Sequence, residues 1–233
     1  ISDSRLNPDK MPVYDAEPRI EWRNRVPVMM LGEARILSYI CWWDPALGRV
    51  GSDASAFCIV LTDAQGRLYW HRAVTLTGDL EMFNGVKLVD GQVHQIIKTL
   101  RMLNLAHVHV ETNGPGTFIP PILTRHAKPH GIGVTERHMS TNKQARILDA
   151  LEAPLSSGFL WCHESVLETP AFEQMRTFDP LLTNQKDDYI DALASAILET
   201  PIRLGRIVPV DATPIQTGTR SNKAAEVQVD FGD

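Results

Sequence analysis

The sequence predicts an α/β protein built on a mixed β-sheet whose first strands are antiparallel. Three hydrophobic segments with short connections come first and are typical of strands, at residues 38–43, 55–62 and 67–76. After Gly78, apolar side chains recur at helical spacing, which predicts a helix over residues 92–105. Short strand segments then alternate with helices, at residues 106–110, 131–135 and 158–162. This order is typical of an α/β fold.

The composition fits a globular domain. The chain has 233 residues, of which 43% are hydrophobic and 22% charged, and its length suits one domain, with or without extensions. The formal net charge of −5 argues mildly against a general nucleic-acid binder, because phosphate contacts need Lys and Arg. Metal-binding carboxylates would raise the acidic count, however, and local patches decide attraction more than the sum does.

The three cysteines, Cys41, Cys58 and Cys162, are widely spaced and form no Cys-x-x-Cys pair. This favours a reducing compartment and disfavours a structural zinc site. No apolar run approaches the roughly 20 residues that span a bilayer, so no membrane partner is expected.

The two ends of the chain differ in composition from its middle. Residues 1–27 are rich in Pro, Asp, Glu and Arg without a clear period, which predicts an irregular arm, and the ordered core is expected to begin near Ala34. From Pro201 onward the chain is polar and is expected to form a tail.

The remaining helices have recognisable start signals. A short helix is expected around residues 118–123, and Thr141-x-x-Gln144 resembles a capping box that opens a helix closed by Pro154. Thr169 and Pro170 suit the N-cap and first position of a helix to about Phe178, and residues 187–199 form the last helix.

Acidic residues mark three places at the edges of these elements. Asp44 ends the first strand, after two tryptophans and before Pro45, where a carboxylate needs a partner. A lone Asp at a strand end is more often simply solvated, and Asp53 in the following loop fits that description better. Asp188 and Asp191 share one face of the last helix, where like charges repel, while Asp187 suits its first turn.

Glu111 is the remaining acidic place. Period-2 alternation puts His107, His109 and Glu111 on one face of a strand, a pattern that could ligate a transition metal but more often does not. Gly114 and Gly116 follow and would let a ligand approach the backbone, or would simply form the turn. Three separated acidic places are what a two-metal site needs, although many α/β proteins offer them by chance.

Three motifs together resemble the nuclease domain of the large terminase subunit of tailed bacteriophages. They are Trp43-Asp44-Pro45-Ala46 with residues 51–56, Val110-Glu111-Thr112-Asn113-Gly114, and residues 186–193. The segment 140–147 and the strand after it also resemble that family, so the match runs from about Tyr39 to Ile197. The resemblance implies a ribonuclease H-like mixed sheet, antiparallel in its first three strands and then parallel, flanked by helices.

The resemblance also implies a site and its cofactors. Asp44, Glu111 and Asp191 would hold two divalent ions, Mg²⁺ or Mn²⁺, with Asp188 as an auxiliary ligand or in place of Asp191. The implied activity is metal-dependent endonucleolytic hydrolysis of concatemeric viral DNA. Basic residues between the acidic places are the candidates for contacts with DNA phosphates: Arg125, Lys128, Arg137, Lys143 and Arg146.

The implied biology follows the family. Double-stranded DNA, the portal protein and the small terminase subunit are the expected partners, in the cytoplasm of an infected bacterial host and transiently at the procapsid portal vertex. Terminases also carry an ATPase domain, and this sequence has no Gly-x-x-x-x-Gly-Lys-Ser/Thr motif. Residues 1–33 would be the connection to that domain, residues 34–200 the nuclease domain, and residues 201–233 a flexible tail.

Three other functions stay open at this stage. A Holliday-junction resolvase or a transposase-type nuclease would keep the fold and change the substrate. A nucleotide-binding protein of the actin or sugar-kinase type shares the strand order, but it would need a second glycine-rich turn and a duplication that this sequence lacks. A non-catalytic DNA scaffold would bind no divalent ion.

Overall fold

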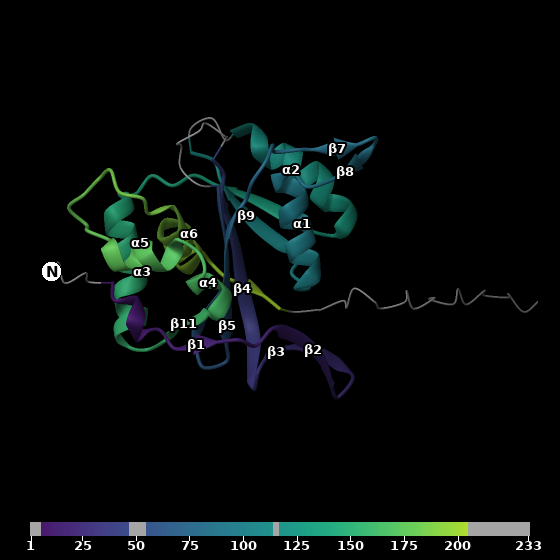
Figure 1. The fold of residues 1–233 in the computed structure, drawn as a ribbon. Helices are drawn as coiled ribbons and strands as arrows, with labels where there is room; N and C mark the ends of the chain where they lie inside the picture. The colour runs from purple at the N-terminus through teal and green to yellow at the C-terminus, as the bar shows by residue number, and fades with distance from the viewer. Residues whose placement is uncertain (1–5, 47–54, 114–116, 205–233) are drawn as a thin grey trace, which may run out of the picture.

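One mixed sheet forms the centre of the computed structural model, which describes residues 6–46, 55–113 and 117–204. Its strands follow the order β1-β11-β6-β5-β4-β3-β2, and β9, β10 and β12 join it through β4. Helices cover both faces, with α3 and α6 on one side and α1 and α2 on the other (Figure 1). The strands are β1 (Val13–Tyr14), β2 (Pro18–Arg23), β3 (Val26–Leu31), β4 (Ala34–Asp44), β5 (Ala56–Asp63), β6 (Leu68–Thr75), β9 (His107–Glu111), β10 (Gly133–Arg137), β11 (Leu160–His163) and β12 (Ile202–Arg203).

The helices and a small hairpin complete the described elements. The hairpin strands β7 (Phe83–Asn84) and β8 (Lys87–Leu88) pair only with each other. The helices are α1 (Gln92–Met102), α2 (Ile119–Ala127), α3 (Lys143–Ser156), α4 (Glu164–Leu167), α5 (Ala171–Thr177) and α6 (Asp188–Leu198), with 3₁₀ turns η1 (Pro8–Lys10) and η3 (Lys128–His130). None of the helices in these ranges is long and apolar enough to cross a membrane.

The strand directions agree with the mixed sheet expected from the sequence. Strands β4, β5 and β6 are antiparallel to one another, whereas β9 runs parallel to β4, β10 to β9, and β11 to β6. The three cysteines are buried and free, as their position in apolar strands predicts.

Strand β4 separates two hydrophobic cores. Successive side chains of a strand point to opposite faces, so Trp42 packs into the core under α3 and α6, and Trp43 into the core under α1 and α2. Both indoles are completely buried. Residues two positions along β4 from Trp42, including Asp44, therefore belong to the α3–α6 face.

The prediction of an irregular arm before Ala34 is wrong. Strands β1, β2 and β3 all join the central sheet, and Leu6 and Met11 are buried in the core. Asn24 and Arg25, with φ of 50° and 65°, form the tight turn between β2 and β3. The charged residues that hid this hairpin suit an outer strand, because charges discourage further strand pairing.

Several helix and tail boundaries also differ from the prediction. Asn142, not Thr141, caps α3 by accepting a hydrogen bond from the Ala145 amide at 3.0 Å, and Pro154 lies inside the last turn of that helix instead of ending it. Pro170 is the N-cap of α5, and Thr169 Oγ1 accepts from the Ala171 amide. Ile202 and Arg203 pair with β4, so the tail does not begin at Pro201.

Candidate active site

The ends of β4 and β9 place two carboxylates side by side. Trp43 on β4 pairs in register with Val110 on β9, so the next residues of these parallel strands, Asp44 and Glu111, end the strands at one edge of the sheet. Helix α6 packs against β4 and β5 and begins at this edge, with Asp188 and Asp191 in its first turn. Functional groups of open α/β sheets commonly lie at such strand ends.

Neighbouring carboxylates raise the pKa of Asp44 and of Glu111. Burial raises the pKa of Asp44 well above its usual range, Glu111, Asp191 and Asp188 raise it further, and Lys143 opposes them. The pKa of Glu111 is raised by burial and by Asp191, against Arg146, Trp42 and Lys143. Glu111, Asp188 and Asp191 are buried, and Asp44 is partly exposed. The four side chains thus form one electrostatic cluster, which we call the acid cluster.

Helix α3 supplies cations to the acid cluster. Arg146 donates to Asp191 Oδ1 through Nε at 3.1 Å and Nη2 at 2.6 Å. Lys143 Nζ lies 2.5 Å from Asp187 Oδ1 and 3.5 Å from Asp191 Oδ2. Burial alone would lower the pKa of Lys143, but Asp191, Asp187 and Asp188 raise it overall, so its ammonium stays charged.

The other predicted DNA contacts lie outside the acid cluster. Arg137 pairs with Glu199, and its Nε lies 2.5 Å from Glu199 Oε2. Arg125 on α2 pairs with Glu81 at 2.6 Å, and Lys128 lies in η3 after α2. The five basic residues therefore do not form one patch. One acidic and two glycine positions that the sequence had pointed to lie outside the residues that the structure describes. They are Asp53, Gly114 and Gly116.

Sequence reasoning missed Asn113. Its Nδ2 donates to Glu111 Oε1 at 2.6 Å, and its Oδ1 accepts from the Met139 amide at 3.1 Å, so it orients the Glu111 carboxylate. The feature of the sequence that could have indicated this contact is the position of Asn113 in the loop, two residues after Glu111. Asp187 was also missed as a partner of Lys143, because its place at a helix start already explained its charge.

The family of the chain follows from a match over this part of the sequence. The family model described as "Terminase Bacteriophage T7, Ribonuclease H-like domain" matches residues 44–160. The chain belongs to this family. The membership confirms the resemblance and the ribonuclease H-like fold expected from the sequence, and it makes the chain a nuclease of that fold.

Solved structures give more distant likenesses. The nuclease domain of the large terminase subunit gp2 of bacterial virus Sf6 is 13% identical, with 71% of this chain and 89% of that chain covered and a TM-score of 0.47. A mutant of the same domain with manganese and β-thujaplicinol gives a TM-score of 0.49 at 13% identity, with the same coverage. The yeast mitochondrial Holliday junction resolvase Ydc2 is 12% identical, covers 68% of this chain and 77% of its own, and has a TM-score of 0.41. No curated protein matches the sequence.

The acid cluster has the chemistry that hard divalent cations need. Carboxylate oxygens are the preferred ligands of Mg²⁺ and Mn²⁺. Glu111 Oε2 is buried without a hydrogen-bond partner among the described residues, which leaves one acceptor available. Within those residues no three His, Cys, Asp or Glu side chains are arranged to hold an ion as they stand. A cation bound at Asp191 would have to compete with Arg146 and Lys143.

The two histidines beside Glu111 have structural contacts. His107 Nε2 lies 2.9 Å from Thr135 Oγ1, and the His109 ring stacks on Trp42 with 6.0 Å between centroids. Burial, with His107, lowers the pKa of His109 to about 4, so its ring is neutral near pH 7. The expected shared face is confirmed by the contact between the two rings, whose centroids are 4.6 Å apart.

Proposed function

We propose that the chain is the metal-dependent endodeoxyribonuclease domain of a phage DNA-packaging terminase, which cuts concatemeric viral DNA. The observation that carries the proposal is the acid cluster, in which β4, β9 and α6 contribute carboxylates to one edge of a terminase-family sheet. Such an edge-located group of carboxylates suits phosphodiester hydrolysis assisted by two metal ions.

Each residue of the acid cluster has a proposed role. Asp44 is the shared ligand, because it ends β4, which pairs with β9 beside Glu111 and packs against α6. Glu111 and Asp191 complete the ligand set, and Asp188 is auxiliary. Two divalent ions held there would activate water and stabilise the charge on the leaving oxygen. Asn113 holds Glu111 Oε1 by a hydrogen bond and leaves Oε2 as the oxygen that would bind an ion.

The cations have two proposed roles. Arg146 is buried, so it balances the charge of Asp191 and does not reach a phosphate on the surface. Lys143 is partly exposed and is the better candidate for a phosphate contact beside the site. Arg137, Arg125 and Lys128 remain proposed DNA contacts at other positions.

A plasmid assay tests the activity. The purified chain should convert supercoiled plasmid to nicked and linear forms with Mg²⁺ or Mn²⁺ and not with EDTA. Asp44→Asn keeps the size of the side chain and removes its charge, so the cleavage rate should fall at least about 100-fold. Calorimetric titration with Mn²⁺ should also show weaker binding to this variant.

The matched control is Asp149→Asn, which removes the same charge from an exposed position on α3. This variant should cleave like the unchanged chain. Undiminished cleavage by Asp44→Asn would contradict the proposed site. A synthetic four-way junction cut much faster than linear duplex would instead identify a resolvase.

The proposed partners come from the family. They are double-stranded DNA, a portal protein and a small terminase subunit, with the domain acting beside an ATPase domain that moves the DNA. The proposed location is the cytoplasm of the infected host and, transiently, the portal vertex of the procapsid.

A further inference from the structure

A pocket of about 830 Å³ lies on the α1–α2 side of the sheet, away from the acid cluster. Its residues come from α1, from α2 and η3, from the β7–β8 hairpin and from Ile20 on β2. Helices α1 and α2 cover the core that contains Trp43, whereas the acid cluster lies on the side of Trp42. The pocket is therefore a separate feature of the molecule.

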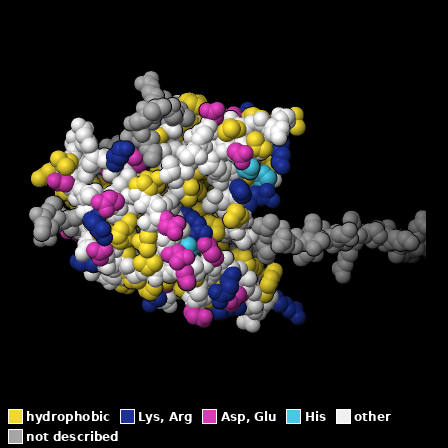
Figure 2. Space-filling view, in the orientation of Figure 1, with side chains coloured by type: hydrophobic (Ala, Val, Ile, Leu, Met, Phe, Trp, Pro, Cys, Tyr) yellow, Lys and Arg dark blue, Asp and Glu magenta, His cyan; other side chains and the backbone are white. Residues whose placement is uncertain are grey.

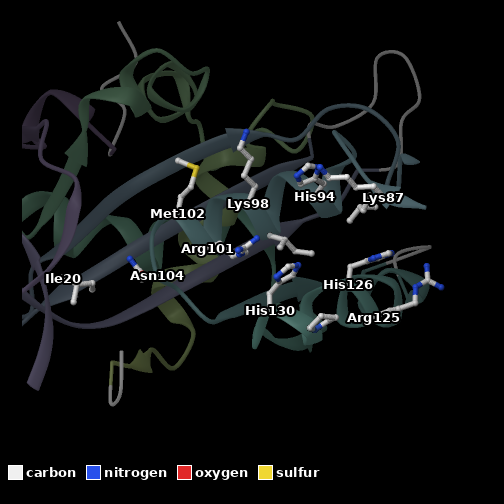
Figure 3. Close-up of a pocket in the computed structure, with 13 residues that line it drawn as sticks. Ile20, Lys87, His94, Lys98, Arg101, Met102, Asn104, Arg125, His126 and His130 are labelled. Carbon is white, nitrogen blue, oxygen red and sulfur yellow. The ribbon is translucent and has the colours of Figure 1, made fainter. Parts of the chain in front are cut away.

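Basic side chains dominate the pocket. His94, Lys98 and Arg101 of α1 form one wall, and Arg125, His126 and His130 form the opposite wall (Figure 3). Lys87 of the hairpin closes one end, and no Asp or Glu is among the described lining residues. Lys, Arg and His side chains also gather over α1 and α2 in the surface view (Figure 2). This concentration stands out in a chain whose net charge is −5.

Most of this positive charge is not neutralised within the described parts of the chain. Glu81 pairs with Arg125 and with His126. Lys87, Lys98 and Arg101 form no ion pair with any described carboxylate. Partial burial and the charge of Arg101 lower the pKa of His130, as expected where like charges are held together. Such a site attracts an anion.

The arrangement of the basic side chains indicates which anion. His94, Lys98 and Arg101 are spaced i, i+4 and i+7, so they follow one face of α1 over about 10 Å. A DNA strand presents one phosphate per roughly 3.4 Å of helix axis, so a row of this length faces several phosphates. A single nucleotide would contact only part of this row of side chains, whereas a longer phosphate backbone would contact all of it. The lining includes Ile97, Met102 and Pro129 but no Phe, Tyr or Trp ring on which a base could stack.

We propose that this pocket binds the backbone phosphates of duplex DNA, as a second DNA-contact surface outside the acid cluster. The inference takes DNA as the substrate from the proposed function and depends on it in no other way. The contacts carry no sequence information, because they involve phosphates and not base edges. They add affinity for DNA beside the segment being cut.

Binding of duplex DNA without divalent ions tests the inference. We expect the double variant Lys98→Ala/Arg101→Ala, measured by fluorescence anisotropy in EDTA, to bind random-sequence duplex at least about tenfold more weakly than the unchanged chain. The slope of log K against log salt should become shallower by about 2, because each lost phosphate contact removes roughly one unit. The matched control Lys10→Ala/Arg35→Ala removes two charges from exposed positions outside the pocket and should leave the affinity and the slope nearly unchanged.

The outcomes separate this inference from the proposed function. An equal loss of duplex affinity in both double variants would overturn the inference that the pocket binds DNA, because any two surface charges would then contribute as much. A Lys98→Ala/Arg101→Ala variant that binds duplex normally but loses affinity for a mononucleotide or inorganic phosphate would also overturn it. Failure of the proposed function appears elsewhere, as undiminished cleavage by Asp44→Asn. Thermal unfolding of each variant shows that it is folded, and Lys98→Glu provides a second variant that should weaken duplex binding further.

Discussion

Arg146 is a buried cation whose partner is a buried carboxylate. Its guanidinium contacts Asp191 Oδ1 twice, and both side chains are only 4% exposed. Removing one member of such a pair leaves the other charge buried without compensation, which costs far more than the pair contributes net. Lys143, 3.5 Å from Asp191, offsets part of that cost.

We therefore expect Arg146→Ala to lower the free energy of unfolding by about 3 kcal/mol in EDTA. Saturating Mn²⁺ should shrink the difference, because a divalent ion at Asp191 would replace the lost charge. Urea denaturation followed by circular dichroism measures both values. Arg176→Ala is the matched control, since it breaks an exposed Arg–Asp pair with Asp9 and should cost less than about 1 kcal/mol. Equal effects of the two variants would contradict this account of Arg146.

At the scale of single residues, the position of the acids can be predicted from the sequence more easily than the position of the cations. Asp44 and Glu111 stand at the ends of apolar strands, and that position shows in a linear pattern. Arg146 was predicted as a surface contact with DNA, because spacing along α3 cannot show that this side chain points inward to α6. The contact between Asn113 and Glu111 depends on the path of the loop after β9, which composition does not determine.

Helix α6 can approach the sheet because its inner side chains are small. Ala192, Ala194, Ser195 and Ala196 are all buried where α6 packs on β4 and β5. The position of the helix in turn sets the position of Asp188 and Asp191 relative to Asp44.

A larger side chain in this contact should move the acids. We expect Ala194→Leu, at a completely buried position, to lower stability by about 1–3 kcal/mol through overpacking. Plasmid cleavage should fall further than the loss of folded protein explains, because α6 would carry its carboxylates away from β4. Ala153→Leu on α3 is the control, since Ala153 is exposed. Normal cleavage by a folded Ala194→Leu variant would show that the spacing of α6 is unimportant.

Whole elements were predicted well where their periodicity was strong. The segments expected for β4, β5, β6, α1 and α6 are all present, with ends shifted by a few residues. Strands β2 and β3 were missed because their pairing is with each other and with the start of β4, and because β2 carries charged side chains. The N-cap of α3 is Asn142 and not the predicted Thr141, because the Asn142 side chain accepts the hydrogen bond from the Ala145 amide.

Across the whole molecule, a buried histidine ties the N-terminal segment to the sheet. His71 on β6 contacts the Tyr14 hydroxyl through Nδ1 at 3.0 Å and Glu17 Oε2 through Nε2 at 3.0 Å. Burial, aided by the Arg72 charge, lowers the pKa of His71 from 6.5 to about 3. Burial raises the pKa of Glu17, but Arg72 and His71 together lower it overall.

These shifts predict a loss of stability in acid. Between pH 6.5 and about 3 the unfolded chain binds a proton at His71 and the folded chain does not, so stability falls as pH falls through this window. Glu17 acts in the same direction at lower pH, because its folded-state pKa is depressed. The slope from His71 is at most about 1.4 kcal/mol per pH unit.

Urea denaturation at pH 7 and pH 5 measures this slope. His71→Gln should be less stable at pH 7 but should lose less stability on going to pH 5 than the unchanged chain. His138→Gln, at an exposed position, should keep the original pH dependence. An unaltered slope in His71→Gln would show that another group controls the acid response.

The arrangement of the two faces could not be predicted from the sequence. The basic pocket takes residues from α1, α2, η3 and the β7–β8 hairpin, which are brought together only by packing over β4 and β9. The acid cluster had markers in the sequence, because Asp44 and Glu111 end strands of the sheet and Asp188 and Asp191 share one face at the start of α6. The pocket had no such marker, and of its lining residues only Arg125 was predicted to have a function, as one of the candidate contacts with DNA.

The alternation of Trp42 and Trp43 along β4 gives each face of the sheet its own chromophore. The Trp42 indole stacks on His109 and lowers the pKa of Glu111. The Trp43 indole donates to Ser55 Oγ at 2.9 Å, in contact with the first turn of α1 through Gln92. An ion bound near the carboxylates would change the surroundings of Trp42, whereas a movement of α1 would change those of Trp43. Adjacent residues can thus act as separate optical probes of two events in one domain.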